Sequence, residues 1–166
     1  MMWNKKKRRM TPAALKTISA VISAFLAVCF FLPAYAYHMP NYDRTLSFFR
    51  VVFPGTADSV FTGHSAFSFL LILPVAMIVL PFFRSRGTDP FRVVLPLAVV
   101  YFFVLMAMIN QFQEIRDLLQ TGIVVLGSTE QSHAGPAVGC IAASAASIAQ
   151  IAAGIAYLRM NASPDE

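Results

Sequence analysis

Charged residues are scarce in this chain: of its 166 residues, only 13% are Asp, Glu, Lys or Arg. Water-soluble domains carry roughly 25% charged residues, so the shortage argues against a surface made for water. Hydrophobic residues make up 57% of the chain, and the mean hydropathy is +0.64. These values indicate that lipid surrounds most of the polypeptide.

Carboxylates are absent from the long apolar stretches of the sequence, which are 17–36, 60–83, 93–109 and 134–158. Proton-coupled carriers and small multidrug exporters use a buried carboxylate as the exchangeable site, and charge inside a membrane usually marks function. The absence therefore disfavours a carboxylate-coupled transporter.

Cysteine is also rare, with Cys29 and Cys140 as the two examples, and no CxxC motif occurs. A thiol-redox site and a zinc knuckle are therefore unsupported. Both residues lie within apolar stretches, where we interpret them as small, polarizable core residues.

Each apolar stretch is long enough, or nearly so, to cross the roughly 30 Å bilayer core as a helix. We therefore expect an all-α transmembrane protein, a four-helix membrane bundle that forms a single domain over residues 1–166. The outer loops, 37–59 and 110–133, are too short to bury a separate soluble core. The net charge of +5 predicts membrane orientation rather than nucleic-acid binding, because the basic residues cluster beside the spans.

The basic residues fall almost entirely on one side of the expected spans. With a cytoplasmic amino terminus, only Arg44, Arg50 and Arg116 lie outside. Cytoplasmic loops carry an excess of Lys and Arg, so this bias predicts that both termini are cytoplasmic. The expected location is a bacterial plasma membrane, with the lipid bilayer as the first partner.

The amino-terminal segment allows a second interpretation. Basic Lys5–Arg9, apolar Ile18–Leu32 and the sequence Ala34-Tyr35-Ala36 resemble a secretory signal with a cleavage site after Ala36. Cleavage there would leave three spans, whereas the long uncharged run favours a retained first span. Both alternatives stay open at this point.

The outer loops predict a small extracytoplasmic β element. Leu46–Phe53 is rich in aromatic and β-branched residues, which is typical of a strand, and it is closed by Pro54-Gly55. Gly122–Gly127 is the second strand candidate. Helical spacing over Gln111–Gln120 predicts that the third helix continues outward before it.

The last span is built largely from small residues, which let helix backbones approach closely in lipid. Packing inside the same chain is favoured over a partner interface, although a homo-oligomer or another membrane protein remains a candidate partner. A GxxxG pattern lies at the outer end of this last span. The candidate helix-packing residues are Gly135, Gly139, Ala143, Ala146, Ser147, Gln150 and Gly154.

The segment Thr62–Phe67 resembles the PSGHS motif of the type 2 phosphatidic acid phosphatase superfamily, in which the histidine holds or protonates a phosphate. That resemblance implies a phosphate-handling role for His64. The family's other motifs are missing, because no proline follows Arg50 and Ser85-Arg86 is followed by Arg92 instead of a histidine. We expect no such enzyme.

Three histidines, His38, His64 and His133, are predicted at the outer ends of different helices. Together they form a candidate zinc or copper site, but no ligand spacing supports it. We expect instead that histidine is simply tolerated at wet interfaces, and we expect no cofactor.

The layout resembles small four-span bacterial membrane proteins of unassigned role, through Leu32-Pro33-Ala34-Tyr35, the β-rich outer loop and the final Tyr157-Leu158-Arg159. This resemblance implies a plasma membrane and no activity. We expect a non-enzymatic structural, accessory or assembly subunit that packs through its last helix. The alternatives are a small channel or carrier, and a phosphatase-like enzyme or outer metal site that uses His64.

Overall fold

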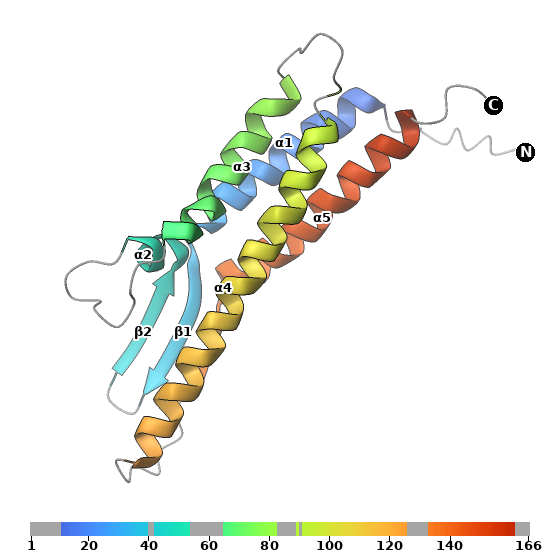
Figure 1. Cartoon of the computed structure of the whole chain (residues 1–166). Helices are drawn as coiled ribbons and strands as arrows, with labels where there is room; N and C mark the ends of the chain where they lie inside the picture. Colours follow the sequence, from blue (N-terminus) through green and yellow to red (C-terminus); the bar gives the residue numbers. More distant parts are fainter. Residues whose placement is uncertain are drawn as a thin grey trace, which may run out of the picture.

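The computed structural model describes residues 11–39, 42–53, 65–82, 89, 91–125 and 133–161. Most of these residues are helical, and a small sheet lies at one end of the helices (Figure 1). The long helices are α1 (Pro12–Cys29), α3 (Phe69–Val79), α4 (Phe91–Val125) and α5 (Val138–Asn161). Two short 3₁₀ helices flank α3, η1 (Ser65–Ser68) before it and η2 (Leu80–Phe82) after it.

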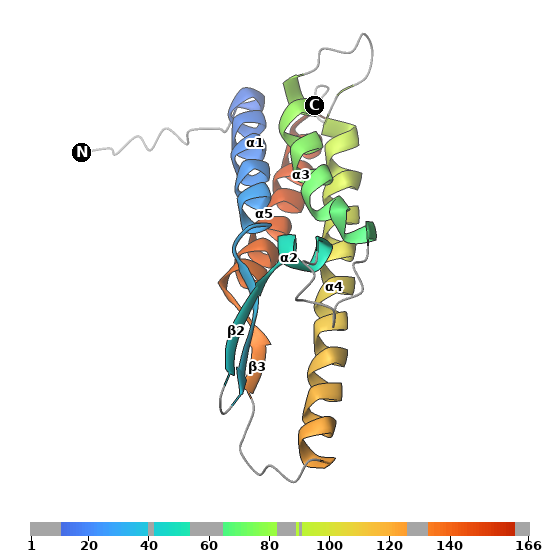
Figure 2. The same cartoon turned by 90° about the vertical axis from the view of Figure 1, so that its left-hand side faces the viewer.

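The long helices pack as a ring in which each contacts two neighbours. Helix α5 packs against α1 and α4, and α3 packs against the same two helices from the other side. Successive helices run in opposite directions, so α1 begins and α5 ends at the same end of the bundle (Figures 1 and 2). We call this the terminal end, and the opposite one the sheet end.

Within the described residues, two helices are long and apolar enough to cross a membrane, over Phe91–Gln113 in α4 and Val138–Met160 in α5. Ala13–Cys29 and Phe69–Phe82 are apolar but shorter. At about 1.5 Å per residue, the 18 residues of α1 still span about 27 Å, close to the bilayer core. The expectation of four spans is therefore met only in part.

The first helix ends earlier than the stretch 17–36 suggests. Helix α1 begins at a cap in which the Thr11 hydroxyl accepts a hydrogen bond from the backbone N–H of Ala14, at 3.3 Å. It ends at Cys29, and the N–H of Leu32 donates to the Cys29 carbonyl across the following turn, at 3.2 Å. Pro33 has no N–H to continue the helical ladder, and the chain leaves as a strand.

The sheet has the strand order β2-β1-β3, with antiparallel pairing throughout. Its strands are β1 (Pro33–Met39), β2 (Tyr42–Ser47) and β3 (His133–Pro136). An outer sheet was expected, but from other segments. The central strand comes from the end of the expected first span, and β3 comes from the start of the expected last span.

The strand candidate Leu46–Phe53 is wrong beyond Ser47, and the candidate Gly122–Gly127 is wrong over 122–125, while 126 and 127 lie outside the described residues. Ser47 ends β2, because its hydroxyl accepts from the N–H of Arg50 at 3.3 Å and caps a short helix, α2 (Phe48–Val52). Residues 122–125 belong to α4, which runs unbroken to Val125. The continuation of the third helix over residues 111–120 is confirmed, and the helix extends further than expected.

The core continues from the bundle into the sheet. Tyr35 of β1 stacks on Phe112 of α4, with ring centroids 4.7 Å apart and an interplanar angle of 12°. Tyr37 and Leu46 are buried on the same side of the sheet as Tyr35. In Figure 2, α4 runs past the ends of the other helices and alongside the sheet.

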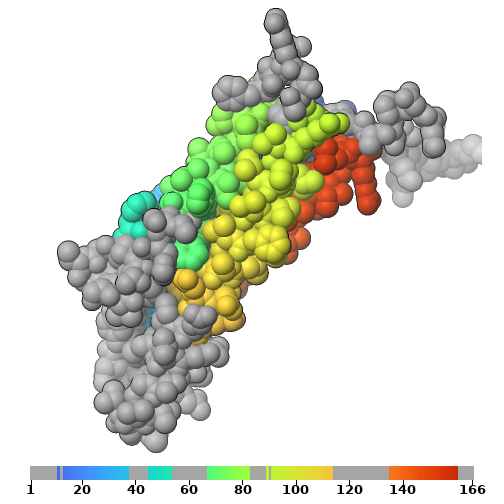
Figure 3. All heavy atoms as spheres, in the orientation of Figure 1, coloured from blue at the N-terminus to red at the C-terminus, as the bar shows by residue number. Residues whose placement is uncertain are grey.

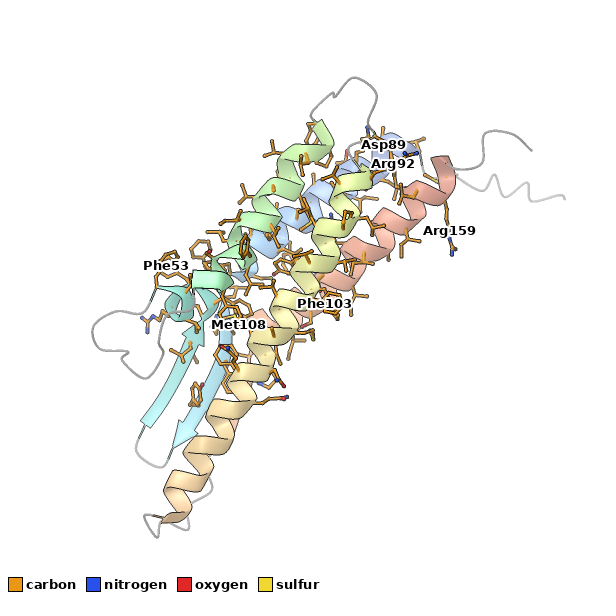
Figure 4. All side chains as sticks on the ribbon, viewed as in Figure 1. Phe53, Asp89, Arg92, Phe103, Met108 and Arg159 are labelled. Atoms are coloured by element: carbon orange, nitrogen blue, oxygen red, sulfur yellow. The ribbon has the colours of Figure 1, made fainter. Side chains whose placement is uncertain are left out.

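A second, smaller cluster closes the terminal end. Phe91 stacks on Tyr157 at 4.1 Å between centroids, and the Lys16 ammonium lies 5.9 Å from the centre of the Tyr157 ring. Asp89 caps α4, because its carboxylate accepts from the N–H of Phe91 at 3.2 Å. Figure 4 labels Arg92 and Arg159 at this end, far from Phe53 at the sheet end.

Candidate functional site

The inner face of α5 is the main packing surface of the bundle. Ala143, Ala146, Ser147, Gln150 and Gly154 are all buried. Their three- and four-residue spacing puts them on one side of the helix, toward α1 and α4. The structure therefore brings these candidate packing residues together inside the chain.

The two glycines of the GxxxG pattern do different things. Gly139 is in α5, where a Cβ atom would lie 2.7 Å from the carbonyl oxygen of Pro33. Gly135 is in β3, and a Cβ there would meet nothing within 4 Å. The pattern is therefore not one helical surface, since only Gly139 allows close backbone approach.

A polar contact joins α1 to α5 in the middle of the bundle. The side-chain amide of Gln150 donates from Nε2 to the Ser19 hydroxyl at 2.6 Å, and both residues are buried. The Ser23 hydroxyl donates to the Ser19 carbonyl at 2.9 Å. Gln150 Oε1 is buried and has no hydrogen-bond partner in the described part of the chain.

Sequence reasoning found Gln150 and Ser147 but missed their counterpart on α1. The signal was the pair Ser19 and Ser23, four residues apart in a largely apolar helix and therefore on one face. Ser147 donates to the Ser144 carbonyl at 2.8 Å, within its own helix. Among these polar groups, Gln150 bonds across to α1, whereas Ser23 and Ser147 bond to carbonyls of their own helices.

The outward faces of the helices are apolar. Phe103 is 65% exposed on α4, and Val138 is 68% exposed at the start of α5. In the most apolar windows of α4 and α5, only 28% and 39% of the residues are buried within the chain. Figure 3 shows α3, α4 and α5 side by side on one open face. The other exposed large side chains on the long helices include Val21, Phe25, Val28, Ile72, Val75, Val79, Val100, Ile141, Ile148 and Ile155.

The expected outer histidines are only partly brought together. His38 of β1 is paired in register with His133 of β3 and, on its other side, with Asp43 of β2. His64 lies outside the described residues. Among the residues that the structure describes, no group of three or more His, Cys, Asp or Glu side chains is able to hold a metal ion.

The phosphatase-like segment continues into η1 at the sheet end of the bundle, next to α2. Arg92 lies at the terminal end, a bundle length away (Figure 4). Of the remaining positions of that motif, 62–64 and 85–86 lie outside the described residues. The two regions that the resemblance would have to combine are thus separated.

Comparisons with protein-family models, with curated proteins and with solved structures gave no match to this chain.

Proposed function

We propose that this chain is a multi-pass membrane protein that works as a non-enzymatic accessory or assembly subunit. The carrying observation is the distribution of polarity: the helices are apolar on their outward faces, while Ser19, Ser23, Ser147 and Gln150 are buried between them. A helix that is apolar all round belongs in lipid or in the centre of a large protein. The second setting does not fit α4 and α5, because only 28% and 39% of the residues in their apolar windows are buried within the chain.

The extent of the exposed apolar surface supports the same proposal. Monomeric soluble proteins rarely expose contiguous apolar patches larger than a few hundred Å². Here each of the long helices carries exposed apolar side chains over the residues whose side chains the structure describes. Water would make such a surface aggregate, whereas hydrocarbon requires it.

We propose four spans with α1 retained in the mature protein. Helix α1 packs against α3 and α5, and its Ser19 supplies the hydrogen bond to Gln150. Cleavage after Ala36 would remove that helix and cut the central strand of the sheet. Lys16, Arg92 and Arg159 at the terminal end favour a cytoplasmic position for that end, with the sheet on the outer side.

The outward face of α5 is the surface that we propose for assembly. Its inner face is occupied by α1 and α4, which leaves small exposed residues on the opposite side. Their spacing of four and three residues forms a stripe that lets a second helix approach closely. The residues of this outward stripe are Ala145, Ala149, Ala152 and Ala156.

Two measurements test this function. Membranes from cells expressing the full chain are washed with alkaline carbonate, and we expect the protein to stay in the pellet until detergent is added. Chemical crosslinking in those membranes then measures association, with Ala149→Leu expected to lower the crosslinked fraction several-fold. Ala107→Leu is the matched control, because Ala107 is also exposed but lies on α4, outside the stripe. A protein released by carbonate, or equal crosslinking in A149L and wild type, would contradict the proposal.

A further inference from the structure

A polar hollow lies where the bundle meets the sheet. It has a volume of about 230 Å³ and is lined by Phe31, Pro33, Thr45, Ser47 and Arg50. Pockets for drug-sized ligands occupy roughly 300–1,000 Å³, so this one suits a single small polar group. The register pairs Pro33 with Ser47, and Thr45 lies two residues away on the same face of the hairpin. The opposite face carries the buried Tyr35 and Leu46.

Arg50 gives the hollow its charge. Its side chain is exposed, and it lines the hollow together with the side chains of Thr45 and Ser47. Its backbone N–H is held by the Ser47 hydroxyl, which fixes the start of the side chain beside the hollow. Arginine stays protonated and presents a planar fork of donors that matches phosphate oxygens. An exposed arginine beside the hydroxyls of Thr45 and Ser47 is suited to an anion.

An apolar rim adjoins this polar wall. Three exposed phenylalanines form this rim, Phe31, Phe49 and Phe53. The ring centroids of Phe31 and Phe49 are 5.6 Å apart, and those of Phe49 and Phe53 are 5.2 Å apart. Phe31 belongs to both the rim and the hollow. Aromatic side chains are enriched where a membrane meets water. Together the two surfaces would orient an amphipathic ligand, with its polar end at Arg50 and its apolar end at the phenylalanines.

The position of the hollow along the bundle agrees with this orientation of the ligand. The hollow begins just beyond Cys29, where α1 ends about 27 Å from its start, roughly one hydrocarbon thickness away. If the bundle spans a bilayer, Arg50 lies at the depth of the outer headgroups. That depth rests on the membrane placement proposed above.

We propose that the hollow binds the phosphate of a phospholipid in the outer leaflet, through Arg50 and Thr45, with the lipid's acyl chains against Phe31, Phe49 and Phe53. Free phosphate would share the polar contacts but not the apolar rim. The lipid would anchor the sheet to the membrane surface and fix the tilt of the hairpin. No covalent step is involved.

The test uses the detergent-purified full chain and native mass spectrometry. Dioleoylphosphatidylglycerol is the probe, dioleoylglycerol is the same lipid without phosphate, and inorganic phosphate is the free anion. We expect tight retention of one phosphatidylglycerol, at least fivefold weaker retention of dioleoylglycerol, and no displacement by millimolar phosphate. Arg50→Gln should weaken retention at least fivefold, and Thr45→Val less. Arg159→Gln, an exposed arginine at the terminal end, is the control and should bind as wild type does.

Equal retention in R50Q and wild type would overturn the lipid site, and displacement by phosphate would reassign it to a free anion. Circular dichroism of R50Q excludes loss of fold as the cause of weaker binding. Carbonate extraction separates the two proposals. A chain that stays in the membrane but retains lipid without Arg50 refutes only this inference, whereas a chain released by carbonate refutes the membrane placement itself.

Discussion

At the residue scale, the contact between Gln150 and Ser19 decides how α1 and α5 align. Gln150 is the one long polar side chain in the buried part of α5, and its amide donates to the Ser19 hydroxyl at 2.6 Å. Hydrogen bonds between helices in lipid contribute about 0.6 kcal/mol on average and up to about 1.7 kcal/mol. The pair therefore fixes alignment more than it adds stability.

The two partners of this bond should respond differently to removal. Ser19→Ala leaves both polar ends of Gln150 buried and unpaired, so we expect a loss of about 1–2 kcal/mol in the free energy of unfolding. Gln150→Leu also removes the unpaired Oε1, and the Ser19 hydroxyl can return to a carbonyl of its own helix, so it should cost less. Reversible unfolding in mixed micelles measures both, and the double variant should be more stable than S19A. A less stable double variant would contradict this assignment.

A second residue-scale prediction concerns Tyr37 in the sheet. Its hydroxyl is buried without a partner in the described part of the chain. Burial is the larger cause that raises the pKa of Tyr37 above the ordinary 10.0, and the nearby Tyr35 is the smaller one. A raised pKa favours the neutral phenol in the folded state. The contribution of Tyr37 to the free energy of unfolding is therefore fully present below about pH 10, the pKa of the unfolded state. It is lost as the pH rises above that value, because the unfolded chain then releases the phenol proton and the folded chain does not.

Tyr37→Phe should remove this alkaline dependence. Replacing an unpaired buried hydroxyl by hydrogen is expected to leave stability at neutral pH unchanged or slightly higher. The measurement is the free energy of unfolding from pH 8 to pH 11, for both proteins. The same decline above pH 10 in Y37F and wild type would show that another group is responsible.

At the element scale, the junction between α5 and the end of α1 depends on the space at Gly139. A Cβ there would meet the Pro33 carbonyl at 2.7 Å and Leu32 Cβ at 3.0 Å, both parts of a backbone turn with little freedom to move. Overpacking of this kind costs about 1–3 kcal/mol. The corner therefore needs glycine for its close approach.

Gly139→Ala should lower the thermal unfolding midpoint clearly, with Gly135→Ala as its matched control. A Cβ atom added at Gly135 would meet nothing within 4 Å, so the same change there should be nearly neutral. Thermal unfolding of both variants in detergent tests the contrast. Equal midpoints for the two variants would mean that a side chain fits at Gly139, which contradicts the close contact with Pro33 in the structure.

Helix existence could be predicted from the sequence, while the ends of the helices could not. Length and apolarity located α4 and α5, because no other described element holds so long an apolar run. Pro33 and the Ser47 cap are local signals that turned an expected span end into a strand and an expected strand into α2. Residues Gly122–Val125 belong instead to the last part of α4, which continues unbroken to Val125.

The candidate site shows the same division. The inner face of α5 followed from its small residues, whereas the junction hollow did not. Phe31, Thr45 and Arg50 belong to three different elements, or to the turns between them, and only the β1–β2 pairing brings them together. The spacing of these residues in the sequence does not predict that they lie together.

At the scale of the whole molecule, retention of α1 decides whether the proposed bundle has four spans or three. We expect the intact mass of the protein purified from membranes to include residues 12–36, because α1 closes the ring with α3 and α5. Intact-mass spectrometry measures this directly. A mass that begins after Ala36 would leave three helices and remove the Ser19 partner of Gln150, which would contradict the four-span account.

The central claim is that lipid surrounds the outward apolar faces of all the long helices. Nitroxide labels on single cysteines at Val21, Ile72, Phe103 and Ile148 sample each helix in turn, and Cys29 and Cys140 are buried and should stay unlabelled. With the chain in bilayers, collision with dissolved oxygen should exceed collision with a water-soluble nickel chelate at every site. Dominant nickel collision at these positions would show that water faces the helices, and the account would then be wrong.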